Sequence, residues 1–386
     1  MTMTPLRLTV PVGTRPEVIK LAGVVAALRD RGHQVRCVAT GQHEDPRMYA
    51  DVFAGLGLEP DAAWRLDGSE GQRVGGLLAN AYREVETYRP DAVLVLGDTY
   101  TAPLMSLAAR RYGAGVIHLE AGLRSFNERS MEESNRKVVA ALATLHLAPT
   151  RLAARFLRAE GVPAARIRVV GNPVIDALRA TGLPRLPVAE RRGVLVTAHR
   201  ATNVDDPDRL RVLVDLVEEL GAERGPVLFP LHPRTATRLR EQGLHDRLVA
   251  APGVRCCEPL PFPELLQAMA ASRVVVTDSG GLQEEASWFG VPTVIMRTTT
   301  PRWEGVELGA ARLTGLDPQR VRAAVAAFWP DQEQQRVAAL PCPYGDGRTG
   351  QRIATLLTDS VVRSLLAPRE PAFGEMELPG PLEEGR

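Results

Sequence analysis

The sequence has little that would connect it with disulfides, nucleic acid or a membrane. Only four of its 386 residues are cysteine and none forms a CxxC pair, so we expect reduced, mostly buried thiols instead of metal ligands or disulfides. The 47 basic and 46 acidic residues nearly cancel, which leaves no electrostatic attraction for nucleic acid or an anionic membrane. No apolar run approaches the roughly 20 residues of a membrane-spanning helix, and residues 1–10 lack a signal-peptide pattern, so we expect a soluble, cytoplasmic protein.

Short aliphatic runs alternate with helical patterns along most of the chain. Such runs are typical of parallel strands that helices cover on both faces. The runs that we interpret as strands are residues 6–10, 34–39, 92–96, 116–119, 145–147, 167–170, 194–197, 226–231, 254–257, 273–277 and 293–296. Because 386 residues exceed one ordinary core, the pattern predicts an α/β protein with two Rossmann-like, doubly wound parallel-sheet domains that face each other.

We expect the boundary between the two domains near residue 180. Residues 1–180 would form the first domain and 181–350 the second, with a Pro- and Arg-rich hinge at 183–192. A helical pattern at 351–367 predicts a last helix that crosses back to the first domain. Residues 368–386 are rich in Pro, Gly and Glu, so we expect a mobile tail.

Three acidic residues in the first half stand where chemistry is expected. Asp98 and Glu120 each follow the end of a predicted strand, and Glu132 opens a helical pattern. Because ligands of open α/β sheets bind beyond the carboxyl ends of the strands, we expect Asp98 and Glu120 to share one cleft. Each acid has a structural alternative, as a helix cap or an arginine partner. Three of them within 40 residues favour the functional interpretation.

Segment 13–17, which reads GTRPE, joins the first strand to the first helix. A turn of this kind directs free backbone N–H groups and a helix dipole at a ligand, and Arg15 adds a guanidinium, so a diphosphate is one candidate ligand. Taken alone, the segment favours the alternative, an ordinary capped turn that binds nothing.

Histidines follow two strands of the second half. His199 lies in the sequence AHRATN, and His232 in HPR together with Arg234. The same rule for parallel sheets puts these side chains on the rim that faces the first domain. The alternative for each histidine is a structural role with satisfied hydrogen bonds.

Segment 278–286, DSGGLQEEA, is the strongest local signal of the second half. The turn at Ser279, Gly280 and Gly281 lets backbone approach a phosphate at the start of a helix, and Glu285 is spaced to accept from ribose hydroxyls. It is not GxGxxG, which argues against a nicotinamide or flavin dinucleotide. A nucleoside diphosphate fits better.

Ten segments in order across about residues 6–366 resemble the non-hydrolysing UDP-N-acetylglucosamine 2-epimerases. These are GTRPE (13–17), GQH (41–43), GDT (97–99), HLEAGLR (118–124), EESNR (132–136), GNPVIDAL (171–178), TAHR (197–200), HPR (232–234), DSGGLQEEA (278–286) and PYGDG (343–347). The resemblance implies a GT-B-like fold, a homodimer, and interconversion of UDP-N-acetylglucosamine and UDP-N-acetylmannosamine without metal or redox cofactor.

The resemblance also implies a mechanism and a set of residues. A carboxylate removes the proton at carbon 2 while UDP leaves carbon 1, and UDP then adds back to 2-acetamidoglucal as the opposite face is protonated. The matching catalytic residues are Asp98, Glu120, Glu132 and His199. Residues assigned to the UDP-sugar are Arg15, Lys20, Arg136, His232, Arg234, Ser279, Gly280, Gly281, Glu285 and Arg302, and those assigned to a possible allosteric site are Gln42, His43 and Arg200.

The identity of the base stays open at this point. Glu132 at a helix start favours its ionised form and hence the role of base, whereas desolvation favours a protonated Glu120. The main alternative function is a GT-B glycosyltransferase, which has less use for three acids together. A third is a non-catalytic nucleotide-sugar sensor, which would more readily have lost one of them.

Several positions depart from the family's pattern. Met131 stands in place of a proline, Thr202 in place of a glutamate, and Cys342 in place of an asparagine. Segment 300–304, TPRWE, replaces a TERPE-like segment beside the expected diphosphate. Segment 68–72 lacks the arginine expected at the allosteric site.

Overall fold

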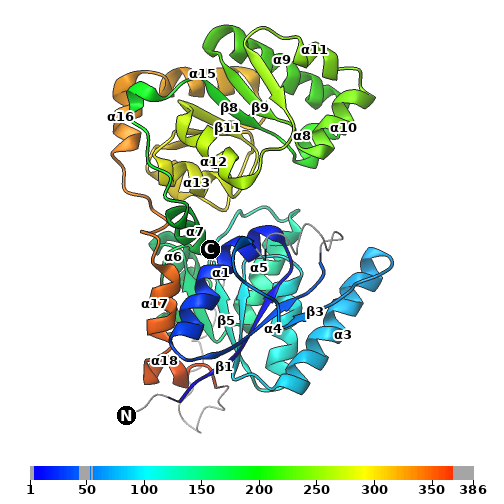
Figure 1. Ribbon diagram of the computed structural model, residues 1–386, viewed down its shortest axis with the longest axis vertical. Helices are drawn as coiled ribbons and strands as arrows, with labels where there is room; N and C mark the ends of the chain where they lie inside the picture. The colour runs from blue at the N-terminus through cyan, green and yellow to red at the C-terminus, as the bar shows by residue number, and fades with distance from the viewer. Residues whose placement is uncertain (1–3, 43–52, 54, 368–386) are drawn as a thin grey trace, which may run out of the picture.

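The computed structural model describes residues 4–42, 53 and 55–367, which form two α/β domains, one above the other in Figure 1. Each domain is built around its own parallel sheet. The predicted fold class, two Rossmann-like domains in a GT-B-like arrangement, is therefore confirmed. The expected tail at 368–386 lies outside the described residues.

In the described part of the N-terminal domain, seven parallel strands have the order β3-β2-β1-β4-β5-β6-β7. The central strands β4 and β5 are buried along their whole length, as their aliphatic sequences require. The strands are β1 (Arg7–Val12), β2 (Gln34–Ala39), β3 (Ala62–Ala63), β4 (Ala92–Leu96), β5 (Gly115–Leu119), β6 (Leu145–Ala148) and β7 (Ile167–Val169).

Helices connect these strands and cover both faces of the sheet. Proline is tolerated in the first turn of α1 because the N–H it lacks has no helical partner there. The helices are α1 (Arg15–Asp30), α3 (Glu70–Tyr88), α4 (Thr101–Arg111), α5 (Met131–Leu142), α6 (Arg151–Ala159), the 3₁₀ turn η1 (Ala164–Arg166) and α7 (Pro173–Ala180).

The C-terminal domain has a second parallel sheet with the order β10-β9-β8-β11-β12-β13. Its strands are β8 (Val194–Thr197), β9 (Val227–Pro230), β10 (Val254–Cys257), β11 (Val274–Thr277), β12 (Thr293–Ile295) and β13 (Ala311–Leu313). Its helices and one 3₁₀ turn are η2 (Val188–Glu190), α8 (Ala201–Val204), α9 (Pro207–Arg224), α10 (Pro233–Glu241), α11 (His245–Val249), α12 (Phe262–Ala271), α13 (Leu282–Phe289), α14 (Glu304–Glu307), α15 (Pro318–Phe328) and α16 (Asp331–Ala338). No helix in the described ranges is long and apolar enough to cross a membrane.

The single helix predicted at 351–367 is instead two short helices. These are α17 (Thr349–Leu356) and α18 (Ser360–Ser364). The break occurs because Asp359 caps α18, its side chain accepting a hydrogen bond from the N–H of Val361 at 2.8 Å. Ile353 and Val362 are fully buried in the core that also contains β1.

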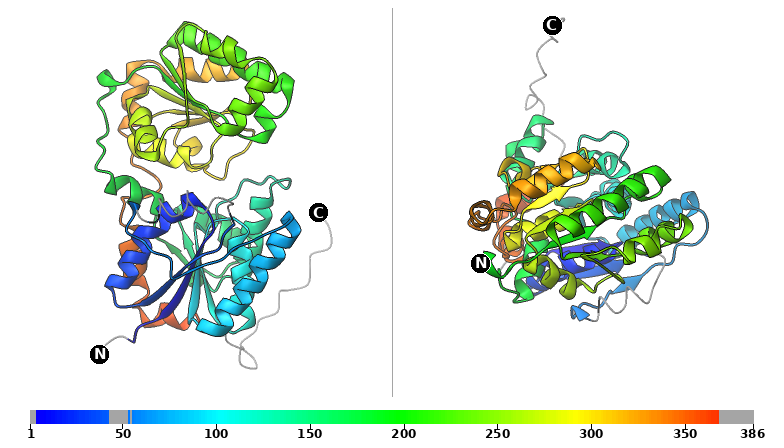
Figure 2. Two further views of the ribbon diagram at one scale, coloured as in Figure 1. Left: turned by 45° about the vertical axis from the view of Figure 1, so that its right-hand side comes forward. Right: turned by 90° about the horizontal axis from the view of Figure 1, so that it is seen from above.

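The chain passes twice between the domains. One connection follows α7 and the other follows α16, and both lie on the same side of the molecule in Figures 1 and 2. In Figure 1 the orange-to-red α17 and α18 lie against the N-terminal domain beside the blue α1. With both connections on one side, the opposite side of the gap between the sheets is free of covalent links.

Candidate active site

A cavity of about 490 Å³ lies between the two domains, beyond the carboxyl ends of the strands in both sheets. That volume is within the usual range for a small-molecule site. Most of the predicted residues line it: Arg15, Lys20, Asp98, Glu120, Glu132, Arg136, Arg200, Ser279, Gly280, Gly281, Glu285 and Arg302. The strand-end rule thus brings residues from both halves of the chain together.

Four other predicted residues are described by the structure but are not in the wall of this cavity: His199, His232, Arg234 and Gln42. The side chain of His199 lies 3.3 Å from Asp278, Nδ1 to Oδ1, with its ring 5.2 Å from that of His232. Arg234, predicted to hold the UDP-sugar, instead forms an exposed ion pair with Asp205 at 2.5 Å. Gln42 accepts hydrogen bonds from Thr101. His43 lies outside the described residues.

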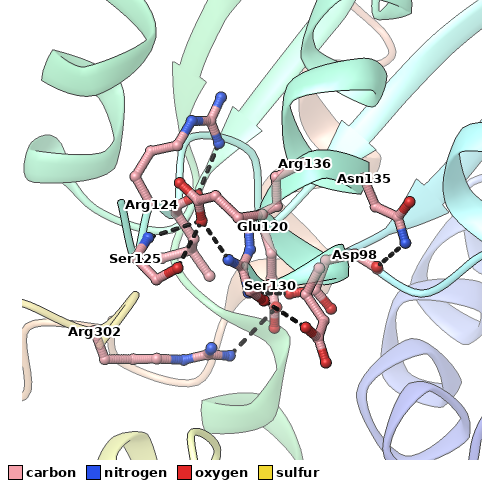
Figure 3. Close-up of polar contacts among 12 residues, drawn as sticks. Asp98, Glu120, Arg124, Ser125, Ser130, Asn135, Arg136 and Arg302 are labelled. Carbon is pink, nitrogen blue, oxygen red and sulfur yellow. Dashed lines mark hydrogen bonds and ion pairs between the residues drawn. The ribbon is translucent and has the colours of Figure 1, made fainter. Parts of the chain in front are cut away.

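Asp98 follows β4 and is fixed by two neighbouring residues of α5. Its carboxylate forms an ion pair with Arg136, and its backbone carbonyl accepts from Asn135 Nδ2 at 2.8 Å. Arg136 also binds Glu133 at 2.7 Å, so its guanidinium is held on two sides. Figure 3 shows Asp98 and Arg136 in one cluster with Glu120 and Arg302. With 25% of its side chain exposed, Asp98 remains open to a ligand.

Glu120 follows β5 in a strained conformation. Its φ of 62° is rare for a residue other than glycine, and such strain is concentrated at functional sites. Burial acts to raise the pKa of Glu120, but its ion pairs with Lys20 and, at 3.8 Å, with Arg302 outweigh burial, so the pKa is lowered. Desolvation alone would favour a protonated Glu120, but the two cations favour the ionised carboxylate.

Glu132 differs from Asp98 and Glu120 in its lack of an ion pair with any described residue. Burial acts to raise its pKa, yet the hydrogen bond from Ser130 and the charges of Arg200 and Arg136 lower it overall. It lines the cavity from the first turn of α5 and forms no ion pair with a described residue. An ionised carboxylate that is free to accept a proton fits the role of base.

The contacts of Glu17 support the capped turn that segment 13–17, taken alone, favours. Its carboxylate accepts the N–H groups of Gly13 at 2.6 Å and Thr14 at 3.1 Å, so these two amides are not available to a diphosphate. It also accepts from Thr99 at 2.8 Å. Burial nevertheless raises the pKa of Glu17 to about 7. Its position on the cavity wall was not predicted, although its sequence is part of GTRPE.

Glu285 is the second carboxyl group whose pKa lies near neutrality. Burial, reinforced by the adjacent Glu284, raises the pKa of Glu285 to about 7. Within the described structure its Oε2 has no hydrogen-bond partner. An unsatisfied buried oxygen on the cavity wall fits an acceptor for a ligand hydroxyl.

Three arginines in the wall, Arg15, Arg200 and Arg297, form no ion pair with a described residue. The Nε of Arg200 is buried without a hydrogen-bond partner in that part of the chain. Burial, followed by Arg200 and Arg302, lowers the pKa of Arg297 to about 10. Arg297 was not predicted, and its only signal is that it follows a strand end. Unpaired cations in a half-buried cavity favour an anionic ligand.

Two cationic side chains approach the backbone at Gly280 closely. A Cβ on Gly280 would lie 3.3 Å from Nη1 of Arg302 and 3.9 Å from Nη1 of Arg297. The start of α13, where a helix dipole favours negative charge, therefore lies beside two guanidinium groups. Among the described residues, no group of three or more His, Cys, Asp or Glu side chains is arranged to hold a metal ion.

The family model described as UDP-N-acetylglucosamine 2-epimerase matches residues 26–358 of this chain. The chain belongs to the UDP-N-acetylglucosamine 2-epimerase family. A UDP-N-acetylglucosamine 2-epimerase of Methanocaldococcus jannaschii is 33% identical over 372 residues, which cover 92% of this chain and 99% of the relative. A crystal structure of the M. jannaschii enzyme in complex with UDP-GlcNAc and UDP has a TM-score of 0.79 and 32% identity, with 91% of this chain and 99% of that one covered.

The UDP-N-acetylglucosamine 2-epimerase family also includes a relative with a different named substrate. The UDP-2,3-diacetamido-2,3-dideoxy-D-glucuronate 2-epimerase of Pseudomonas aeruginosa is 35% identical over 362 residues, covering 90% of this chain and 98% of the relative. Both relatives are epimerases, which are isomerases. The predicted family and enzyme class are therefore confirmed.

Proposed function

We propose that this chain interconverts UDP-N-acetylglucosamine and UDP-N-acetylmannosamine, and that it does so by eliminating UDP and adding it back with inversion at carbon 2. The observation that carries the proposal is the composition of one interdomain cavity. Ionised carboxylates from the N-terminal domain face unpaired cations and the Gly280 turn across it. Elimination needs both, a base for the proton and positive charge for the leaving group.

The first step of the proposed reaction divides between the two domains. Glu132 takes the proton from carbon 2, the electron pair of that C–H bond forms a carbon 1–carbon 2 double bond, and the carbon 1–oxygen bond breaks towards the β-phosphate. UDP gains one negative charge in this step. We assign the stabilisation of that charge to Arg15, Arg200 and Arg297, which line the cavity and form no ion pair with a described residue.

The second step requires a proton from the other face of the sugar ring. Asp98 and Glu120 line the same cavity, where they form ion pairs with Arg136 and with Lys20 and Arg302 respectively. We assign that proton transfer to Asp98 or Glu120 in its protonated form: the carboxylic acid gives its proton to carbon 2 and becomes a carboxylate, while the β-phosphate oxygen of UDP bonds to carbon 1. For Glu120 this requires that UDP draws the charge of Lys20 and Arg302 away from the carboxyl group. His199, whose backbone N–H donates to Asp278, is assigned to the departing UDP together with its neighbour Arg200.

The rest of the proposal concerns binding and assembly. We assign the diphosphate to Ser279, Gly280 and Gly281 and the ribose to Glu285, with His232 and Arg234 at the rim. For the possible allosteric site, Arg73 donates to the backbone carbonyl of Gln42 at 2.6 Å, one position beyond the segment that lacks an arginine. We also propose a homodimer, which light scattering on the purified protein tests.

The experiment is solvent isotope incorporation. Purified protein with UDP-N-acetylglucosamine in deuterated water is expected to form the manno epimer and to place deuterium at carbon 2, without added cofactor. UDP-2,3-diacetamido-2,3-dideoxy-D-glucuronate, which the name of the P. aeruginosa relative contains, is assayed in parallel. That relative is as similar to this chain in sequence as the M. jannaschii enzyme is. Exchange with that sugar alone would move the proposal to the second substrate. No exchange with either, but sugar transfer to an added alcohol, would refute epimerisation.

A further inference from the structure

Trp303 makes a contact across the two domains that the proposed reaction does not use. It stands in the loop between β12 and α14, on the C-terminal domain. Its indole Nε1 donates a hydrogen bond to the backbone carbonyl of Arg124 at 2.9 Å, on the N-terminal domain. A TERPE-like segment has a proline at this place, and a proline ring carries no N–H donor. A proline at position 303 could therefore not make this contact, whereas the tryptophan of TPRWE does.

The segment that receives this hydrogen bond is rigidly held. The side chain of Arg124 is fully buried and makes a bidentate pair with Glu160, with both distances 2.6 Å. The N–H and hydroxyl groups of Ser125 both donate to Glu133, at 2.8 and 2.9 Å. Figure 3 shows Arg124 and Ser125 beside the carboxylate cluster. A donor that docks here is fixed relative to the N-terminal sheet.

This receiving segment is connected to the candidate catalytic carboxylates. Glu133, which holds Ser125, also binds Arg136 at 2.7 Å, and Arg136 forms the ion pair with Asp98. On the other side, Arg302 directly precedes Trp303 and binds Glu284 at 3.0 Å and Glu120 at 3.8 Å. A displacement of Trp303 therefore moves Arg302, which after Lys20 is the second cation that keeps Glu120 ionised.

Aromatic packing supports the same contact. The ring of Trp303 lies 6.5 Å from that of Phe126, which in turn lies 5.2 Å from Phe156 in an edge-to-face arrangement. Phe126 is 58% exposed and has a φ of 56°, an uncommon conformation for a bulky residue. Its N–H donates to Glu133 at 3.2 Å, which helps to hold it there. Next to Trp303, Glu304 accepts from Thr150 at 2.5 Å, and Glu307 forms an ion pair with Arg155 at 3.5 Å, so both ends of α14 contact the N-terminal domain.

We propose that Trp303 is a positioning residue that fixes Arg302 against Glu120 by docking its loop on Arg124 of the other domain. The inference depends on the proposed function for its kinetic readout only. The hydrogen bond from the indole N–H to Arg124 orients the side chain of Trp303, and packing of its ring against Phe126 adds apolar contact.

The first test compares Trp303→Phe, which keeps a ring and removes the donor, with Trp329→Phe. Trp329 is a matched control because it lies in the same domain and stacks on Arg224 and Arg273 at 5.3 Å, outside the cavity wall. For Trp303→Phe we expect kcat to fall about 10- to 100-fold with KM little changed, as a small misplacement of a catalytic group produces. We also expect the acid limb of the pH profile to move to higher pH. Arg302, which together with Lys20 lowers the pKa of Glu120, is then held less closely to that carboxylate.

The second test is hydrogen exchange, which needs no turnover. Amides of α14, such as Glu307, whose N–H donates to the carbonyl of Trp303 at 2.8 Å, are expected to exchange faster in Trp303→Phe than in the wild type or in Trp329→Phe. This result stands even if the wild type proves not to epimerise, so failure of the function and failure of the inference are distinguishable.

A Trp303→Phe variant with wild-type kcat, acid limb and exchange would overturn the proposal. So would equal losses in Trp303→Phe and Trp329→Phe that follow a common drop in melting temperature. Should Trp303→Phe fail to fold, Phe126→Leu replaces it, because that side chain is largely exposed. The same upward movement of the acid limb is expected there, smaller in size, and its absence would count against the proposal.

Discussion

Arg297→Gln is expected to make the unliganded protein more stable and the enzyme less active. Burial, followed by the charges of Arg200 and Arg302, lowers the pKa of Arg297 from its usual 12.5 to about 10. A base whose pKa is lower in the folded than in the unfolded state disfavours folding wherever it is charged. That cost is complete at every pH below about 10 and disappears as the pH rises to 12.5. At pH 7–8 the Arg297→Gln variant therefore folds without the free-energy cost of burying this charge.

The size of the effect follows from that pKa. A lowering from 12.5 to about 10 corresponds to roughly 3 kcal/mol, which is an upper limit because the side chain is open to the cavity and water screens it. We take ~1–2 kcal/mol, or a rise of a few degrees in melting temperature. In the liganded state the sign reverses, since a charged hydrogen bond to the diphosphate is lost and UDP binding is expected to weaken about 10- to 100-fold.

The measurements are thermal unfolding with and without UDP and calorimetric titration of UDP. Arg247→Gln is the control, because Arg247 is exposed, lies on α11 outside the cavity wall, and is paired with Asp215 at 2.5 Å and Glu218 at 2.6 Å. It is expected to leave UDP affinity unchanged and not to raise the melting temperature. A lower melting temperature for Arg297→Gln together with wild-type UDP affinity would show that the cation serves the fold and not the ligand.

The sequence predicted those parts of the fold that depend on continuous aliphatic runs. The central strands β4 and β8 were placed to the residue, and β1, β5 and β11 to within one or two residues, because buried parallel strands have few other sequences open to them. The edge strands β3 and β13 were missed because neither forms an aliphatic run. β3 has only two residues, and β13 has three with Arg312 in the middle. The break before α18 was missed because the apolar pattern continues through it.

The candidate site was predictable where strand ends decide it and not where side chains choose partners. Asp98 and Glu120 meet because β4 and β5 are neighbours in the sheet. The ion pair of Lys20 with Glu120 joins residues 100 positions apart, and no local pattern encodes it. The same holds for Glu17, whose neighbours in the sequence suggested free amides when its own carboxylate occupies them. Long-range pairing of this kind decides which acid is ionised, and it is visible only in three dimensions.

Three further variants test the carboxyl groups of the cavity, two through activity and one through the pH dependence of stability. Asp98→Asn and Glu120→Gln are each expected to lower kcat by about 100-fold or more, while UDP binding, measured by calorimetry, stays within a few-fold. The reason is that general acid–base groups act on the sugar and not on the nucleotide. Loss of folding, measured by circular dichroism, would mean that the replaced acid is structural. Glu285→Gln is expected to flatten the dependence of melting temperature on pH. The pKa of Glu285 is raised from 4.5 to about 7, so the stability it contributes is complete below pH 4.5 and lost as the pH rises to about 7. A neutral amide cannot lose a proton over that range, so the variant should gain on the wild type between pH 5 and 8, and parallel curves for the two proteins would show that this buried oxygen does not carry the proton we assign to it.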